Sequence, residues 1–532
     1  MRAVGVMRDG RALAAAGSLG LLSISCGQRG EVSRKVSVAP TAAAVAKPSL
    51  YTSAVEARRW IDLALARNLH ESLVKRIDQE CSGRSFQLGH FSKPFEAHEA
   101  TKAVRVAFDL IRGLSGAIEK TTDNTFTSVN TTVVGPGLLW KGHDGEVEQG
   151  PFSVAQLEHA RLELAESSPF ALLTAARESG ALMLAGNTSN DWSGDGTVSV
   201  TFTGDDKVTR ALLISRRDGT VTRCTRLNSD PMLGDETFST EYEYAHPEDT
   251  DPSRITRLCG GRVEFDVHCT PASSPFPDPL AIPPAYETQL VVPPVSGAST
   301  TMVARVSDNL YAVTFSALDS RSLFLVLSHT VYVFEAPYGD EAGKLLLDTI
   351  RREVPSKPIQ YLFLTHHHPD HAGGLRPFVA AGIKIVTTPG NVPYFQSVAS
   401  ERHALRPDEQ WIHPRAAQFE LVSGRRSFRD GDQLVEAIDL GAASRHTDEF
   451  LVFYFPTAKI VFEGDLVKAQ RNGEPLKPAG DRALGLYQYL NSSGLQVDRI
   501  VSSWPAGGRA ISTPFADLAE MVRLRSDATG RP

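Results

Sequence analysis

The sequence has little net charge, few cysteines and no unusual excess of apolar or polar residues. Its 55 basic and 62 acidic residues are well mixed along the chain and give a formal charge of −7, so there is no basic surface pattern of the kind that binds nucleic acid. Apolar residues make up 42% and charged residues 22%, which excludes wholesale disorder and a polytopic membrane protein. A chain of 532 residues is too long for a single core, and we expect two folded domains.

The amino terminus has the pattern of a targeting signal. Met1–Arg11 carries three arginines, and Ala12–Ser25 is an uncharged, mainly apolar run of about fourteen residues, shorter than the roughly 20 that cross a bilayer. The run ends at Cys26 and resembles a bacterial lipoprotein signal, although Ser23 stands where such signals usually carry leucine. We therefore predict an exported protein, periplasmic or membrane-anchored through a lipidated Cys26. An ordinary cleaved signal peptide and an uncleaved anchor remain alternatives.

Four cysteines remain after Cys26, namely Cys81, Cys224, Cys259 and Cys269. An even number in an oxidising compartment is compatible with one or two disulfides. The last three lie on or beside neighbouring expected strands, which favours pairing among them, and buried free thiols are the equal alternative.

We assign residues 1–26 to the signal, 27–50 to a flexible tether and 51–270 to an amino-terminal α+β domain. Apolar spacing predicts helices in Ala54–Cys81, Glu96–Ile118 and Ser153–Ser179. The period then changes to two, which predicts an antiparallel sheet with strands at Thr197–Thr203, Ala211–Arg216, Thr220–Leu227 and Thr237–Tyr244.

One piece of this domain, the segment from Asp230 to Asp235 before a Tyr-rich strand, resembles half-barrel regions that precede some bacterial metallo-hydrolase domains. A curved sheet of that kind could hold a hydrophobic ligand, with a plain scaffold as the alternative. No group of residues in the domain suggests catalysis.

Residues 271–295 hold eight prolines and form the predicted interdomain linker, because such a segment supports neither a regular helix nor a central strand. Residues 296–525 follow as a second domain. The apolar pattern at the start of this domain predicts four short strands, at Met302–Val306, Leu310–Phe315, Ser322–Leu327 and Thr330–Phe334. A helix at Asp340–Arg352 and a buried strand at Ile359–Leu364 come next, and strands and helices then alternate.

Four candidate metal ligands follow the buried strand at once: His366, His368, Asp370 and His371. In a turn that leaves a strand, residues two apart can point the same way, so the first two histidines can chelate one ion while the next two turn toward an adjacent position. Imidazole and carboxylate together suit zinc, and iron or manganese could use the same set.

This His-x-His-x-Asp-His string is the signature of the metallo-β-lactamase superfamily, and two downstream features agree with it. His446 precedes an apolar strand, and Asp465 follows a glycine after the next strand. The resemblance implies the four-layer αββα fold, a first zinc site of His366, His368 and His446, and a second site of Asp370, His371 and Asp465, with Asp465 bridging the two metals.

The chain departs from the family at the last ligand. Members usually supply a final histidine to the second metal from a strand end near the carboxy terminus, and here Trp504 stands at that place. No histidine follows His446. We therefore expect a tight first site and a weakened or empty second one, so one or two zinc ions per chain, unless His403 or His413, both expected in exposed loops, replaces the missing ligand.

The expected activity is that of a zinc-dependent hydrolase in which metal-bound hydroxide attacks an ester, lactone, thioester or amide carbonyl, with Asp370 orienting the nucleophile and shuttling a proton. Thr365 and Thr447 flank ligands and are expected to hydrogen-bond them. By resemblance, Asn391 and Tyr394 would face a small-molecule substrate whose identity the fold does not select. The alternative function is a non-catalytic protein that binds metal or a hydrophobic ligand.

Overall fold

The computed structural model describes residues 50–67, 76–87, 93–123, 127–144, 146–147, 154–184, 196–230, 232–273, 277–282, 301–315, 318–471 and 474–529. The signal, nearly all of the tether and most of the proline-rich linker lie outside these residues, so their assignments stay predictions. Among the described helices, none combines the length and the apolar character that crossing a membrane would require.

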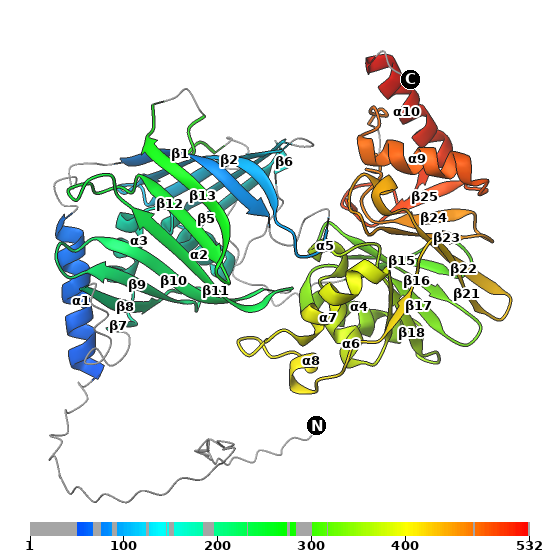
Figure 1. Ribbon diagram of the computed structural model, residues 1–532, viewed down its shortest axis with the longest axis horizontal. Helices are drawn as coiled ribbons and strands as arrows, with labels where there is room; N and C mark the ends of the chain where they lie inside the picture. Colours follow the sequence, from blue (N-terminus) through cyan, green and yellow to red (C-terminus); the bar gives the residue numbers. More distant parts are fainter. Residues whose placement is uncertain are drawn as a thin grey trace, which may run out of the picture. The chain divides into compact units, whose positions relative to one another are not determined.

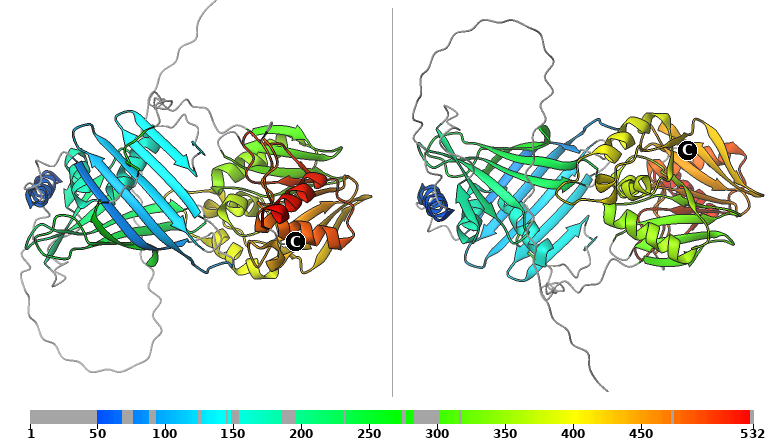
Figure 2. Two further views of the ribbon diagram at one scale, coloured as in Figure 1. Left: turned by 90° about the horizontal axis from the view of Figure 1, so that it is seen from above. Right: turned by 90° about the horizontal axis from the view of Figure 1, so that it is seen from below.

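The amino-terminal half is built on one large antiparallel sheet of thirteen strands, curved in Figures 1 and 2. In spatial order from one edge, its first six strands are β6 (Glu146–Val147), β5 (Leu138–His143), β4 (Thr127–Gly135), β3 (Leu114–Thr122), β2 (His98–Asp109) and β1 (Arg76–Gln87). The remaining seven are β13 (Arg262–Pro271), β12 (Arg254–Cys259), β11 (Gly234–Glu243), β10 (Val221–Asp230), β9 (Thr209–Ser215), β8 (Thr197–Thr203) and β7 (Leu182–Leu184).

Three helices supply apolar residues to the main core of this half: α1 (Leu50–Arg67), α2 (Val154–Ala165) and α3 (Pro169–Glu178). Ile61 of α1 and Leu172 of α3 are both fully buried there, beside alternate residues of the strands such as Val200 and Leu212. The pattern of alternating burial in β8 and β9 is what the period of two predicted. The predicted helices of Ser153–Ser179 are also present.

One predicted helix is wrong, and another is too long at its end. Residues 96–118 form β2 and β3, because Val104, Val106 and Phe108 share one face of a strand, whereas Ile111, which had completed the helical spacing, lies 68% exposed in the turn. The helix expected to reach Cys81 ends at Arg67, and Cys81 lies in β1. The apolar residues of this segment fit the spacing of a helix as well as that of a strand, and only the tertiary structure distinguishes the two.

The expected disulfide pairing among the last three cysteines is also wrong. Cys81 of β1 is bonded to Cys269 of β13, 188 residues away, and these residues lie opposite each other where the two strands pair. Cys224 and Cys259 are buried free thiols, the alternative that the sequence had left open. The sequence analysis had placed Cys81 at the end of a helix, so it could not predict that this cysteine pairs across two neighbouring strands.

A cavity of about 720 Å³ is lined almost entirely by residues of the amino-terminal half. Its wall combines apolar residues such as Val104 and Phe265 with charged residues of both signs, among them Lys102, Glu119 and Glu163. This wall is more polar than the hydrophobic ligand predicted from the sequence would need. That ligand stays a prediction.

The carboxy-terminal half contains two mixed sheets. The first, of seven strands in sequence order, holds β14 (Thr301–Arg305), β15 (Leu310–Phe315), β16 (Arg321–Val326), β17 (Val331–Phe334), β18 (Ile359–Phe363), β19 (Lys384–Thr387) and β20 (Phe419–Leu421). The second, of six strands, holds β21 (Arg425–Asp430), β22 (Gln433–Asp439), β23 (Leu451–Phe455), β24 (Ile460–Glu463), β25 (Arg499–Ser502) and β26 (Thr513–Pro514). The strands and the helix predicted between residues 302 and 364 are all present within one or two residues.

Helices cover both outer faces of the sheet pair. Between the sheets, Phe334 and Phe363 of the first sheet pack with Phe453 of the second. The other face of the first sheet packs against α4 (Gly339–Glu353), α6 (Leu375–Ala380) and α7 (Val392–Ser400). The other face of the second packs against α9 (Asp481–Ser493) and α10 (Phe515–Thr529). This confirms the predicted four-layer αββα fold.

Candidate metal centre

The histidine-rich turn leaves the first sheet at the end of β18. β17 and β18 are parallel, so both end at the same edge. Pro369 begins the short helix α5 (Pro369–Ala372), and the His371 amide donates to the His368 carbonyl at 3.0 Å, which folds the chain back on itself. His366 is fully buried and His368 is 4% exposed. The turn therefore holds two imidazoles in a site closed to most solvent.

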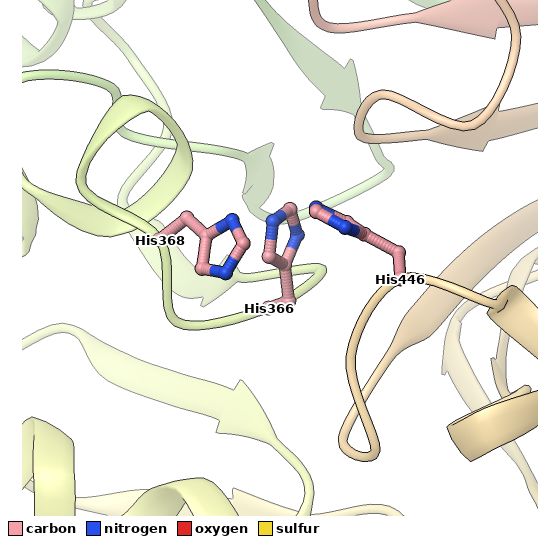
Figure 3. A group of neighbouring side chains, drawn as sticks. All are labelled: His366, His368 and His446. Carbon is pink, nitrogen blue, oxygen red and sulfur yellow. The ribbon is translucent and has the colours of Figure 1, made fainter. Parts of the chain in front are cut away.

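His446 reaches the same edge from the second sheet, in the loop between η4 (Gly441–Ser444) and β23. The Ser444 hydroxyl accepts hydrogen bonds from the amides of His446 at 3.2 Å and Thr447 at 3.3 Å, and Arg445 has a left-handed backbone with φ of 55°. Figure 3 shows the rings of His366, His368 and His446 grouped together. One nitrogen from each of the three lies within 4.8 Å of the others.

The protonation states of this group suit a metal. Burial lowers the pKa of His366 well below its ordinary value and also lowers the pKa of His446, so both rings are neutral at pH 7. Nδ1 of His366 lies 3.0 Å from the hydroxyl of Thr365, as expected, whereas Nε2 is buried with no hydrogen-bond partner among the described residues. A buried lone pair left without a donor is what a metal ligand requires. These residues fit a divalent cation.

A second group of mutually close ligand atoms joins His366 to His371 and Asp465. The sequence had placed Asp370 in this group; in the structure its Oδ2 lies 3.3 Å from Nε2 of His371, and its side chain is 16% exposed. Asp370 therefore borders the site from the solvent side. Thr447, expected to support a ligand, donates to the carbonyl of Glu449 instead.

Glu335 is a site residue that the sequence analysis missed. It is fully buried at the end of β17, accepts from the Thr365 amide at 2.9 Å, and lies 2.5 Å from Nδ1 of His371. Burial by itself lowers the pKa of His371, but Asp370 and Glu335 raise it well above its ordinary value. Glu335 has a positive φ of 69°, so the backbone is held in an uncommon conformation that directs its carboxylate to the ligand turn.

Asp465 follows β24 through Gly464, where a side chain would meet the Thr365 hydroxyl at 2.9 Å and the His371 ring at 3.2 Å. The glycine lets the turn close on the imidazoles. Oδ2 of Asp465 lies 3.1 Å from Nε2 of His446 and accepts a hydrogen bond of 2.6 Å from Arg482, a residue that the sequence analysis did not single out. Burial by itself raises the pKa of Asp465, but His446 and Arg482 lower it well below its ordinary value, so Asp465 carries its negative charge.

Trp504 lies beside this turn. β25 pairs in parallel with β24, and the Trp504 amide donates to the Gly464 carbonyl at 3.1 Å, one residue before Asp465. The place predicted for the missing histidine is therefore next to the aspartate that it would have accompanied. His413 is exposed, whereas His403 is only 4% exposed, contrary to the expectation for that residue. Neither joins a metal-ligand group within the described ranges.

Asn391 and Tyr394 are both buried. The Asn391 side chain is fully buried, with its amide 3.5 Å from the carbonyl of Glu449, and the Tyr394 ring packs edge-on to His367 at 5.5 Å between centroids. Tyr394 therefore packs against the histidine turn, whereas Asn391 contacts the segment that follows His446. Their contact with substrate stays a prediction. His367, expected not to bind metal, is buried in this packing.

The fold and the site together define a four-layer protein with a histidine-rich edge built for a metal. Residues 337–503 match the family model described as the metallo-beta-lactamase superfamily. This part of the chain belongs to that superfamily, which confirms the resemblance drawn from the sequence.

Two curated relatives are similar over part of the chain. A type 2 metallo-beta-lactamase of Elizabethkingia meningoseptica is 27% identical over 173 residues, which are 31% of this chain and 62% of that protein. Metallo-beta-lactamase IND-1 of Chryseobacterium indologenes is 28% identical over 150 residues, which are 28% of this chain and 55% of that protein. The chain thus spans less than two thirds of each relative's length.

Similar solved structures include a metallo-beta-lactamase from Pontibacter korlensis, with 19% identity and a TM-score of 0.31 over 43% of this chain and 100% of that one. The DIM-1 metallo-beta-lactamase has 17% identity and a TM-score of 0.32 over 43% of this chain and 98% of that one.

Proposed function

We propose that this protein is a metal-dependent hydrolase that cleaves an ester, lactone, thioester or amide bond in a small molecule. The observation that carries the proposal is the convergence of His366, His368 and His446 as buried imidazoles, with Nε2 of His366 left without a partner among the described residues. The superfamily match and the metallo-beta-lactamase names of the relatives support hydrolysis as the class of reaction.

Zinc is the cation we propose for these three histidines, and iron or manganese would accept the same donors. When bound, such a cation supplies Lewis acidity that activates water and polarises a carbonyl. The rings of His366 and His446 are neutral because of burial, so these two ligands bind without first losing a proton.

Asp370 is the residue we assign to proton transfer. Its side chain is 16% exposed at the border of the site, so it can contact both an entering water and the departing group of a substrate. Glu335 holds the neighbouring His371 ring from the buried side, and the other nitrogen of that ring faces the Asp370 carboxylate. The chain thus offers a fixed acid–base group next to the three-histidine set.

The experiment is metal analysis of purified protein from residue 27 onward, together with hydrolysis of a panel of small esters, lactones, thioesters and β-lactams. We expect about one tightly bound zinc per chain, and we expect His446→Ala to lose both this zinc and turnover. Unchanged zinc content in His446→Ala would overturn the assignment. Bound zinc without turnover on any substrate would favour the non-catalytic metal-binding alternative.

We also propose that the chain is exported. Support comes from the Cys81–Cys269 disulfide, because such bonds persist in oxidising compartments and are rare in the cytosol. Mass spectrometry of the protein isolated from membranes and from periplasm would test this. A lipidated Cys26 is expected in the membrane fraction, Cys26→Ser should release the protein from it, and an unprocessed Met1 in the cytosol would contradict export.

A further inference from the structure

Arg482 brings a positive charge to Asp465, a residue of the second ligand group. It is the second residue of α9, its side chain is 41% exposed, and its NH1 donates to Oδ2 of Asp465 at 2.6 Å. The same oxygen lies 3.1 Å from Nε2 of His446. The aspartate predicted to bridge two metals therefore already shares one oxygen between an arginine and a ligand of the first site.

The fold holds α9 close to the centre. A side chain on Gly485 would come within 2.4 Å of the Ala443 carbonyl, in the segment that leads to His446. Only glycine permits this approach of the helix to η4. Arg482 lies in the first turn of the same helix, so the packing that positions the loop of His446 also positions the guanidinium.

The second ligand group has one ligand fewer than the family's usual set. Trp504 stands at the place of the final histidine, and its amide is bonded to the residue before Asp465. A divalent cation at this place would have to compete with a guanidinium for Oδ2 of Asp465, and two like charges a few ångströms apart repel.

We propose that Arg482 is a built-in replacement for the second metal ion, and that its ion pair with Asp465 makes this centre mononuclear. The inference rests on the proposed function, since it assumes that the three histidines hold a first metal. Arg482 acts here through Asp465 as a positioning residue: it fixes the carboxylate beside His446 and supplies the positive charge that a second ion would otherwise provide.

The test is titration of the metal-free protein with zinc alone, followed by calorimetry, for the wild type and for Arg482→Met. Arg525→Met is the matched control, because Arg525 also pairs with the start of α9, through Asp481, without touching Asp465. Arg482→Lys keeps the charge in a smaller donor. Circular dichroism checks that each variant is folded.

We expect one tight equivalent in the wild type and in Arg525→Met, and a second equivalent that binds about tenfold tighter or better in Arg482→Met than in the wild type. Arg482→Lys should lie near the wild type. Two equally tight equivalents in the wild type, or an unchanged weak second equivalent in Arg482→Met, would overturn the inference. If the wild-type protein binds no zinc tightly, the proposed function is contradicted, and the inference fails with it. The two failures are therefore distinguishable.

Discussion

Two buried clusters of charged and polar side chains in this chain are balanced in different ways. In the amino-terminal half, the carboxylate of Glu166 is 2% exposed and accepts hydrogen bonds from Arg210, Arg226 and Arg257 at 2.8–3.2 Å. At the histidine-rich edge, Nε2 of His366 is equally buried and has no such partner in the described part of the chain. The buried charge of Glu166 has its partners within the protein, whereas His366 keeps a lone pair that a ligand from outside can use.

The two clusters have different roles. Burying a charge is costly, and the Glu166 cluster offsets that cost with ion pairs, so its role is to hold the sheet and α2 together. A site that keeps uncompensated polar atoms gives up stability that only a ligand restores. Perturbing each cluster should therefore affect a different property, stability in one case and metal binding in the other.

The largest expected effect is a loss of stability when the Glu166 cluster is disrupted. Glu166→Gln removes the one carboxylate that three arginines share, and should lower the free energy of unfolding by about 3–5 kcal/mol, measured by urea denaturation. The control is Glu520→Gln, because Glu520 pairs with Arg523 on an exposed helix face and should cost at most about 1 kcal/mol. Equal losses of unfolding free energy in the two variants would show that the buried cluster stabilises the fold no more than a surface ion pair does.

The next effect is on metal binding at the open cluster. Glu335→Gln weakens the hydrogen bond that the Thr365 amide donates to this carboxylate, and the Thr365 hydroxyl contacts Nδ1 of His366. Zinc affinity at the first site should fall on the order of 10–100-fold, measured by competition with a chelator. Glu341→Gln, an exposed neighbour in α4, should change nothing. If Glu335→Gln left zinc affinity intact and lowered only the melting temperature, the carboxylate would be a structural residue like Glu166.

A smaller effect is expected from restoring the family's ligand. Trp504→His should tighten a second zinc equivalent by less than about tenfold, because Arg482 still holds Asp465, and the gain should grow in the double variant with Arg482→Met. The measurement is the same zinc titration. No gain in either variant would mean that residue 504 does not reach the side of Asp465, despite the bond between its amide and Gly464.

The smallest effect is a pH dependence in the amino-terminal half. Asp206 and Glu163 raise the pKa of His159 from 6.5 to about 9, against burial and the charge of Arg226. A raised pKa in the folded state means that the stabilisation is complete below pH 6.5 and disappears as the pH rises through about 9. His159→Gln should flatten the dependence of the melting temperature on pH over that window. An unchanged slope in the variant would assign it to other groups.

Much of the carboxy-terminal half was predictable because its signals are local. The buried strand that ends in Thr365 and the spacing of His366, His368 and His371 lie within a dozen residues, and a strand followed by a tight turn places these side chains without help from the rest of the fold. His446 is the one ligand of the first metal site that lies far from this turn in sequence. The resemblance supplied it, and the geometry brings it to the same edge.

The amino-terminal half was less predictable because its decisive contacts are distant in sequence. The apolar residues of β2 fit a helix and a strand equally well, and only pairing with β1 and β3 decides between them. The bond between Cys81 and Cys269 depends on β1 lying beside the last strand of the sheet, a neighbour that no local pattern identifies.

The amino-acid sequence was enough to predict the class of fold in the carboxy-terminal half, the three-histidine set and the absence of a final histidine, because each depends on neighbouring residues or on a motif of fixed spacing. The contacts of Glu335 with His371 and of Arg482 with Asp465 became visible only in the folded chain. These residues come from other strands and helices. Their roles follow from which strand ends and helix ends meet at one edge of the sheets, and a carboxylate or guanidinium has no meaning for a metal centre until packing places it there.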